Sequence, residues 1–268
     1  MTNKEANTDY IVAEEIEFLD APVGHNFEEP EHQVAGYESI QVELLGGSDY
    51  KEWVKSAMYA SLVTWDTTPQ LPVTKLQSMP FEKQEELFLR MLTKRPISVA
   101  LEGAVFTFKL TGIPRALTHQ IVRHRQMSFG QQSYRVSSCY SDPVRLPVSL
   151  QERVDAGEPV MDEMKDAYIN TVKAVRSMYK KLIEIGIPME QARSIMPMGT
   201  CTKIAATMRL RDMIEYFKGR TSDIAQDEHT YMVCLMAQEM KDKKPEFFEF
   251  IKSRATNIEE VMATYLNK

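Results

Sequence analysis

The stretch AVFTFKLTGIPRALTHQIVRHRQMSFGQQSYR, residues 104–135, carries the clearest structural signal in the chain. Its first part, Ala104–Leu110, is rich in β-forming residues with phenylalanines at alternate positions, so it predicts a strand that ends at Thr111-Gly112. Pro114 suits the first turn of a helix, where a backbone N–H is not needed, and that helix is predicted to reach about Arg123–Arg125. The chain is therefore expected to be built around a strand followed directly by a helix.

Few strands and many helices are predicted around this unit. Two further segments have strand character, Ser39–Leu45 and Thr200–Met208. Prolines and glycine predict a loop over residues 66–80 and an irregular segment over residues 126–157. Apolar residues at helical spacing predict the remaining helices: Asp49–Ser61, Phe81–Lys94, Val160–Ile185, Met189–Ile195, Asp212–Phe217, Ile224–Met240, Phe247–Ile251 and Ile258–Leu266. This pattern favours an α+β fold over alternating α/β units.

Composition indicates a soluble globular protein. The 268 residues are 43% apolar and 26% charged, and no apolar run approaches the roughly 18 residues that span a membrane. The first 20 residues are acidic and lack the features of a signal peptide, so a cytoplasmic protein is expected. Three widely spaced cysteines, no CxxC and only five histidines without an HExxH pattern argue against a disulfide framework and against a metal site.

The acidic charge of the chain is concentrated at its beginning. Residues 1–35 carry nine acidic residues and one basic residue, whereas the rest has 29 acids and 31 bases and is close to neutral. We therefore expect an acidic N-terminal extension, residues 1–37, followed by one domain, residues 38–268. The lack of a basic excess in this domain argues against a general nucleic-acid surface.

A cluster of cations within this near-neutral domain predicts a local anion site. Arg123, His124 and Arg125 are adjacent, and Ser133 and Arg135 follow shortly after them. Guanidinium groups bind phosphate in a bidentate manner, and hydroxyl groups add further donors. Four more arginines lie beside predicted breaks downstream, and each taken alone is also explained as a surface residue or an ion-pair partner: Arg193, Arg209, Arg211 and Arg220.

Other chemistries have weaker support in the sequence. No GxGxxG and no GxxxxGK[ST] occurs, so neither a Rossmann fingerprint nor a Walker loop is predicted. Ser133 lies near His124, but no acidic residue or GxSxG elbow accompanies it, which disfavours a serine nucleophile. Cys139 stands in the context SSCYS without an activating base and is interpreted as an inert thiol.

The arrangement of Arg123-His124-Arg125, seven further residues, Ser133 and then Arg135 resembles the signature of the flavin-dependent thymidylate synthases, the ThyX family. Three segments in order are similar to that family: VFTFKLTGIPRALTHQIVRHR, IGIPMEQARSIMP and RLRDMIEYFKGRTSDIAQDE. The resemblance covers roughly residues 38–255. It implies an α+β fold of the ThyX type, with a small, mainly antiparallel sheet flanked by helices.

The resemblance also implies a reaction. Members of the family methylate dUMP to dTMP with methylenetetrahydrofolate as carbon donor, reduced FAD as hydride carrier and NADPH as reductant. They form homotetramers with active sites shared between subunits. Arg220 would be catalytic, lying against the pyrimidine and stabilising negative charge on N3 and O2, so that no protein nucleophile is needed.

The family pattern assigns site residues by position. Those expected to bind dUMP are Gln120, Arg123, Ser133, Arg135, Arg193 and Arg220. Those expected to bind FAD are Thr64, Arg123, His124, Arg125, Gln131, Arg209 and Arg211. Positions matched to dUMP mostly keep the family residue, whereas several matched to FAD depart from it: Ile97, Val99, Gly103, Gly130, Gln131, Arg209, Glu215 and Ile224.

Two alternatives to thymidylate synthesis follow from these departures and from the basic cluster. A related enzyme that transfers another one-carbon unit, such as a pyrimidine nucleotide hydroxymethylase, needs no net hydride from a flavin. A non-catalytic nucleotide- or nucleic-acid-binding protein would use the cluster for phosphate binding alone and would lose affinity steeply with salt.

Overall fold

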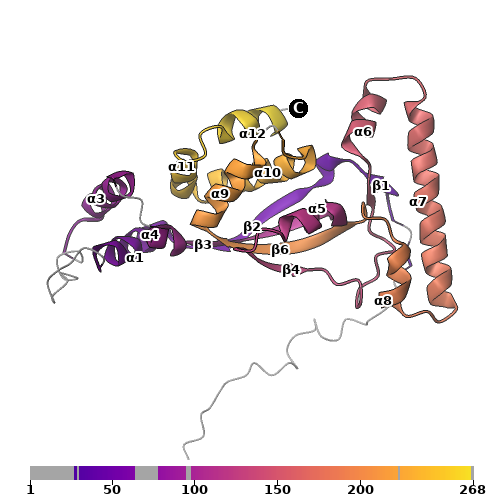
Figure 1. The fold of residues 1–268 in the computed structure, drawn as a ribbon, viewed down its shortest axis with the longest axis horizontal. Helices are drawn as coiled ribbons and strands as arrows, with labels where there is room; N and C mark the ends of the chain where they lie inside the picture. The colour runs from indigo at the N-terminus through magenta and orange to yellow at the C-terminus, as the bar shows by residue number, and fades with distance from the viewer. Residues whose placement is uncertain (1–26, 29, 64–77, 95–97, 223, 267–268) are drawn as a thin grey trace, which may run out of the picture.

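A four-stranded antiparallel sheet forms the centre of the protein (Figure 1). The structure is a computed structural model, and it describes residues 27–28, 30–63, 78–94, 98–222 and 224–266. The strand order is β2-β3-β6-β4, so the two longest strands are paired at the centre. The strands of this sheet are β2 (Gln41–Gly47), β3 (Val105–Pro114), β4 (Ser128–Gln131) and β6 (Cys201–Arg209).

Burial follows the alternation that the sequence of β3 predicts. Phe106, Phe108 and Leu110 are fully buried, and the intervening residues are half-buried or exposed. Phe106 lies opposite Met208 of β6, so both strands place apolar side chains on the same face. This face is covered by helices, which gives the sheet one buried side.

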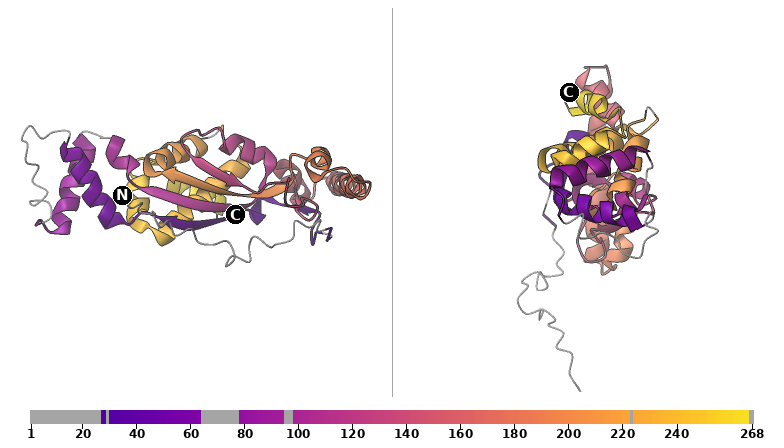
Figure 2. Two further views of the ribbon diagram at one scale, coloured as in Figure 1. Left: turned by 90° about the horizontal axis from the view of Figure 1, so that it is seen from below. Right: turned by 90° about the vertical axis from the view of Figure 1, so that its left-hand side faces the viewer.

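The helices form three groups around the sheet (Figures 1 and 2). One group covers the buried face, where α10 packs on β2 and α9 on β6. A second group lies at one end and a third, dominated by the long α7, lies at the other. The helices over the face are α9 (Leu210–Arg220), α10 (Asp227–Lys243), α11 (Pro245–Lys252) and α12 (Ile258–Leu266). At one end lie α1 (Tyr50–Val63), α3 (Phe81–Lys94) and α4 (Ser98–Glu102). At the other end lie α6 (Val148–Asp155), α7 (Met161–Glu184) and α8 (Met189–Ala192).

Several shorter elements complete the description. The helix α5 (Arg115–Ile121) follows β3 directly and packs against β3 and β6. Two residues of the acidic segment form β1 (Val34–Ala35), which pairs in parallel with β5 (Val144–Arg145). Two short 3-10 helices are η2 (Tyr37–Ser39) and η3 (Arg193–Ile195).

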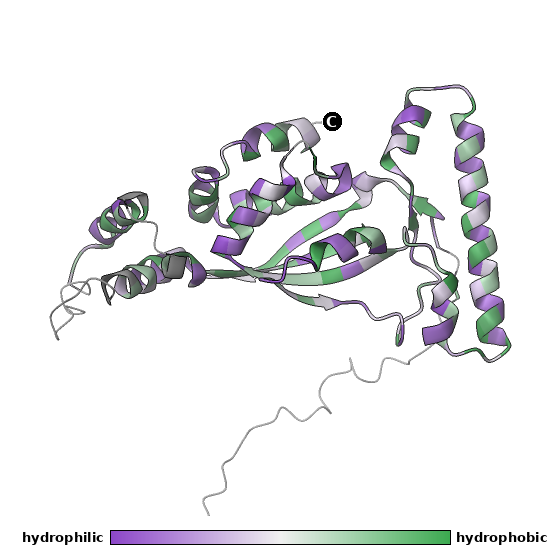
Figure 3. Ribbon diagram, in the orientation of Figure 1, coloured by the Kyte–Doolittle hydropathy of each residue, from purple (hydrophilic) through white to green (hydrophobic). Residues whose placement is uncertain are grey.

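The hydrophobic core lies between the sheet and the helices that cover it. Trp53 of α1, Phe106 of β3 and Phe247 of α11 are buried in one aromatic cluster there. Figure 3 shows hydrophobic residues along the strands, and both hydrophobic and hydrophilic residues along α7. A smaller second cluster joins α7 to the loop after β4 through Tyr179, Tyr140 and Cys139.

The α+β prediction, with a small and mainly antiparallel sheet flanked by helices, is confirmed. The helices predicted over Phe81–Lys94 and Ile258–Leu266 have the predicted bounds. The helix after β3 ends at Ile121, earlier than predicted, because the chain turns there to form β4. The loop predicted over residues 66–80 lies mostly outside the described residues.

Four other sequence predictions need correction. Residues 126–157 are not irregular throughout, because they contain β4, β5 and α6. The strand β3 continues past Gly112, where a bulge with positive φ lets it go on to Pro114. The helix predicted to stop before Gly219 continues to Arg220, and the next one begins at Asp227, not Ile224.

Within the described part of the chain, no helix is long and apolar enough to cross a membrane. The same residues contain no group of three or more His, Cys, Asp or Glu side chains that could hold a metal ion.

Candidate active site

Arg220 and the Arg123-His124-Arg125 motif meet where α5, α9 and α10 come together. Arg220 is the last residue of α9, and His124 lies in the turn just after α5. The Nη2 atom of Arg220 lies 3.0 Å from Nε2 of His124, although the two residues are 96 positions apart. A guanidinium can only donate, so this imidazole nitrogen accepts the hydrogen bond. The contact joins two of the segments in which the sequence predicts site residues.

Two further features of Arg220 are a hydrogen bond at its backbone carbonyl and a buried nitrogen in its side chain. The hydroxyl of Thr230 donates to the carbonyl oxygen of Arg220 at 2.9 Å. The Nε atom of Arg220 is buried, with no hydrogen-bond partner among the described residues. An unpaired buried donor in a half-buried cation is costly unless another group meets it.

His124 is neutral at physiological pH. Burial lowers its pKa from the ordinary value of 6.5, and the positive charge of Arg220 lowers it further. A neutral imidazole is required if Nε2 is to accept a hydrogen bond from a cation. The fixed charge of this pair is therefore carried by Arg220 alone.

Behind Arg220 and His124 lies a second polar chain, which the sequence analysis missed apart from Gln120. The hydroxyl of Tyr216 lies 2.6 Å from Nε2 of His229, and Nδ1 of His229 lies 3.3 Å from Oε1 of Gln120. Nε2 of Gln120 donates to Oε1 of Gln226 at 2.5 Å. One signal was available in the sequence, because Tyr216 precedes Arg220 by four residues and shares its helix face.

His229 is the most strongly perturbed histidine in the described residues. It is fully buried, and this burial, with the charges of Arg220 and His124, lowers its pKa to about 3. The ring of Tyr216 contacts the ring of His124 edge-on, with 4.7 Å between centroids. Tyr216 thus connects the Arg220–His124 pair to the series of hydrogen-bonded side chains that ends at Gln120 and Gln226.

The remaining cations of the motif face solvent. Arg123, Arg125 and Arg135 are exposed, and no carboxylate of the described residues lies within ion-pair distance of them. Ser133 is also exposed, and its Oγ accepts from the backbone N–H of Arg135 at 3.3 Å. These groups are therefore available for an anion.

Two further predicted residues are held by neighbours in their own region. Nε2 of Gln131, at the end of β4, donates to Oγ1 of Thr118 at 3.2 Å. Nε of Arg193 donates to the carbonyl oxygen of Glu190 at 3.2 Å. Among the described residues no hydrogen bond or ion pair connects Arg193 or Arg135 with Arg220. Thr64, also predicted to bind the flavin, lies outside the described residues.

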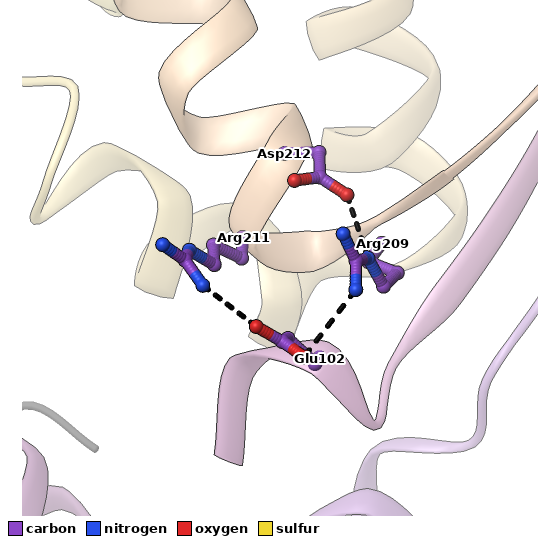
Figure 4. A network of polar contacts seen from close by, with 4 residues as sticks. All are labelled: Glu102, Arg209, Arg211 and Asp212. Atoms are coloured by element: carbon purple, nitrogen blue, oxygen red, sulfur yellow. Dashed lines mark hydrogen bonds and ion pairs between the residues drawn. The ribbon is translucent and has the colours of Figure 1, made fainter. Parts of the chain in front are cut away.

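Arg209 and Arg211 lie together, but carboxylates engage both of them (Figure 4). The two oxygens of Glu102 contact Nη1 of Arg209 at 3.3 Å and Nη1 of Arg211 at 2.6 Å. Nε of Arg209 also contacts Asp212 at 2.7 Å. Two cations and two anions leave this group with no net charge, so it differs from the exposed cations after α5.

Comparison with known proteins places the chain in a family. Residues 46–246 match the thymidylate synthase complementing protein family, Thy1. The chain is 31% identical over 173 residues to a flavin-dependent thymidylate synthase of Sulfurisphaera tokodaii, covering 63% of each chain. It is 35% identical over 153 residues to one of Saccharolobus solfataricus, covering 56% of this chain and 55% of the relative. A third, of Thermococcus onnurineus, is 29% identical over 192 residues, covering 71% of this chain and 74% of the relative.

The matched part of the chain spans less than two thirds of the length of the first two of these relatives. The family match itself runs from β2 to α11 and includes Gln120, His124 and Arg220. Because this match covers well over half of the sequence, the protein belongs to the thymidylate synthase complementing protein (Thy1) family.

Proposed function

We propose that the protein is an enzyme that methylates dUMP to dTMP. Methylenetetrahydrofolate would be the carbon donor, FAD the hydride carrier and NADPH the reductant. The observation that carries this proposal is the contact between Arg220 and His124, because it joins a fixed cation to the RHR motif in a member of the Thy1 family. Similar relatives bear the name flavin-dependent thymidylate synthase, which supports the same reaction.

The nucleotide side of the site has the donors that a phosphate and a pyrimidine need. Arg123 and Arg135 are exposed cations without a carboxylate partner among the described residues, and Ser133 adds a hydroxyl. Gln120 offers an amide beside the buried polar chain. We assign dUMP binding to these four residues together with Arg193 and Arg220.

A shared site accounts for the separation of these residues. Arg193 begins η3 after α8, which lies beside α7 at one end of the protein, whereas α9 lies over the sheet (Figure 1). Residues so far apart can hold one ligand if they come from different subunits. We therefore propose a homotetramer with shared active sites, in which residues 38–268 form the catalytic domain and residues 1–37 an extension. The mass of the native protein in solution tests the assembly.

The fit to a flavin differs between the two groups of residues proposed to bind it. Arg123 and Arg125 are uncompensated cations beside His124 and fit the pyrophosphate of FAD. Arg209 and Arg211 are already paired with Glu102, so only their remaining N–H groups are left to bind such a group. Gln131 and Thr64 complete the proposed set. When bound, the flavin supplies the hydride that reduces the transferred carbon.

Arg220 would act electrostatically on the pyrimidine. His124 accepts a hydrogen bond from its guanidinium, while the hydroxyl of Thr230 donates to the backbone carbonyl of the same residue. A fixed positive charge stabilises the negative charge that develops on N3 and O2 as the ring attacks the carbon donor. The protein therefore needs no covalent nucleophile.

The state of the cysteines supports this mechanism. Burial raises the pKa of Cys139 and Cys201 to about 11 and that of Cys234 to about 12. All three thiols are buried and remain protonated at neutral pH, so none is a ready nucleophile.

The paired state of Arg209 and Arg211 favours a second candidate function. An enzyme that transfers a hydroxymethyl group to a pyrimidine nucleotide needs the nucleotide and the folate but no net hydride. Weaker flavin contacts at this pair would be compatible with such a reaction.

One set of assays separates the two functions. The purified protein is incubated with dUMP and methylenetetrahydrofolate, with and without FAD and NADPH, and the nucleotide product is identified by mass. We expect flavin absorbance in the purified or reconstituted protein and dTMP that forms only with FAD and NADPH. A hydroxymethylated product without FAD would support the second candidate instead. No product under any of these conditions, with the protein folded, would contradict both.

A further inference from the structure

We infer that Tyr216 and His229 are positioning residues that set the orientation of the Gln120 amide, so that it presents an N–H donor to the nucleotide. The inference rests on the proposed function, because Gln120 is assigned there to dUMP. Neither Tyr216 nor His229 has a role in that proposal. Both side chains are buried, with 2% and 0% exposure.

The direction of the hydrogen bonds follows from the two buried groups. Burial raises the pKa of Tyr216, so its phenol keeps its proton. The hydroxyl has one hydrogen-bond partner in the described residues, Nε2 of His229 at 2.6 Å. A buried O–H that donates nowhere is unfavourable, so Tyr216 donates and Nε2 accepts.

The tautomer of His229 then determines the orientation of Gln120. His229 is neutral, so when Nε2 accepts, the proton of the ring lies on Nδ1. Nδ1–H donates to the Oε1 atom of Gln120, 3.3 Å away. The amide nitrogen of Gln120 must then point the other way, toward Gln226, to which it donates at 2.5 Å. The opposite tautomer would leave the hydroxyl of Tyr216 without an acceptor and would turn the amide over.

The orientation limits what Gln120 can bind. An amide nitrogen carries two N–H groups, and the bond to Gln226 uses one of them. The second N–H remains available as a donor, while the oxygen faces the buried imidazole. Carbonyl and phosphate oxygens of a nucleotide match this donor, whereas an amino group would not.

Tyr216 offers a substitution that isolates this effect. Its ring contacts His124, which accepts the hydrogen bond of Arg220, and its hydroxyl contacts only His229 in the described residues. Tyr216→Phe keeps the ring and removes the hydroxyl. The Arg220–His124 pair is therefore retained while His229 loses the donor that selects its tautomer.

The experiment has two arms. In the first, nitrogen NMR of the histidine rings in the ligand-free wild-type protein is expected to show His229 with its proton on Nδ1, and Tyr216→Phe a mixture of tautomers. In the second, calorimetry is expected to show that Tyr216→Phe weakens dUMP binding by roughly 3- to 10-fold, the loss of one neutral hydrogen bond. The KM for dUMP should rise in parallel, with kcat within about twofold of wild type.

Tyr50→Phe is the matched control, because it removes a hydroxyl that donates to Glu85 at 2.7 Å in α3, and it should bind dUMP as wild type does. A proton on Nε2 of His229 in the wild type would overturn the inference. Unchanged dUMP affinity in Tyr216→Phe, with a wild type that binds dUMP, would overturn it too. If the wild type does not bind dUMP at all, the proposed function is contradicted. The proposed role of the Gln120 amide in dUMP binding is then contradicted as well. The tautomer in the wild type is measured even if the variant does not fold.

Discussion

At the scale of single residues, the position of Arg220 at the end of α9 depends on two groups from other segments. These groups are His124, in the turn after α5, and Thr230 of α10. The bond to His124 reduces the freedom of a side chain that would otherwise have many rotamers, and the bond from Thr230 holds the backbone at the end of α9. Such preorganisation lets a cation stabilise developing charge without reorganising during the reaction.

Replacement of Arg220 should therefore affect turnover far more than stability. Arg220→Ala is expected to lower kcat for dTMP formation roughly 100- to 1000-fold, as loss of one preorganised charge-stabilising group does. The free energy of unfolding should change by only about 1 kcal/mol, since one half-buried hydrogen bond is lost. Steady-state kinetics and urea unfolding measure the two effects. Arg153→Ala, which removes an exposed arginine of α6, is the control, and equal activity of both variants would contradict the assigned role.

His229 predicts a pH dependence of stability. Its pKa is about 3 in the folded protein and near the ordinary 6.5 in the unfolded chain, so between these values only the unfolded chain binds the proton. Stability is thus fully present above about pH 6.5 and falls as the pH drops toward 3, by at most about 1.4 kcal/mol per pH unit. Urea unfolding of the wild type at pH 7, 6 and 5 should show this loss.

The non-titrating variant His229→Leu should show a shallower loss over the same pH range. Met232→Ala, which removes a buried side chain from the same helix but keeps His229, serves as a destabilised control and should keep the slope of the wild type. Parallel curves for the wild type and His229→Leu would show that His229 does not titrate in the way proposed.

At the scale of elements, the bulge at Gly112 determines where β3 ends and α5 begins. The register between β3 and β6 shifts between Thr111 and Ile113, and Gly112 has φ of 73°. After the bulge the strand runs to Pro114, and α5 starts at the next residue. The position of Gln120 and His124 therefore depends on this single bulge.

An alanine at position 112 should destabilise the sheet. A β-carbon there would lie 2.8 Å from the carbonyl oxygen of Ser39, and the backbone would be held in a conformation that L residues rarely adopt. Gly112→Ala is expected to reduce the free energy of unfolding by roughly 1–3 kcal/mol. Gly46→Ala in β2, where no atom lies within 4 Å of the added carbon, should be close to neutral. Equal melting temperatures for the two variants would count against this account of the bulge.

At the scale of the whole molecule, Phe247 of α11 packs C-terminal structure against α1 and the central strand. Its ring, from α11, lies 5.2 Å from that of Tyr50, 5.0 Å from that of Trp53 and 4.9 Å from that of Phe106, between centroids. Tyr50 and Trp53 belong to α1, and Phe106 to the central strand. This cluster packs α1 against the sheet and against the C-terminal helices.

Phe247→Ala should consequently be one of the most destabilising substitutions in the protein. Loss of a fully buried phenylalanine removes apolar burial and leaves a cavity, which costs about 3–5 kcal/mol. Urea unfolding followed by tryptophan fluorescence reports on it directly, because Trp53 is a neighbour. Met178→Ala on α7, where the side chain is 47% exposed, should change the unfolding free energy by less than about 1 kcal/mol. A comparable loss in both variants would contradict the central role of the cluster.

The sequence by itself determined the elements whose signal is local. The helices Phe81–Lys94 and Ile258–Leu266 have the predicted bounds, because apolar spacing along one segment is enough to define an amphipathic helix. The sequence also predicts Gln120 and His124 as site residues, and in the structure His124 contacts Arg220 while Gln120 contacts His229.

Only the tertiary structure decided the features that depend on a distant partner. The four residues of β4 have little strand character of their own. They form a strand because they pair with β6, where Ser128 lies opposite Thr207. The end of α5 at Ile121 follows from that pairing, as does the turn that brings His124 to Arg220. Tyr216 and His229 acquired their role only when α9 and α10 were packed together and buried both side chains. Hydrogen bonds between strands and between buried side chains join residues far apart in sequence, so no local pattern records them.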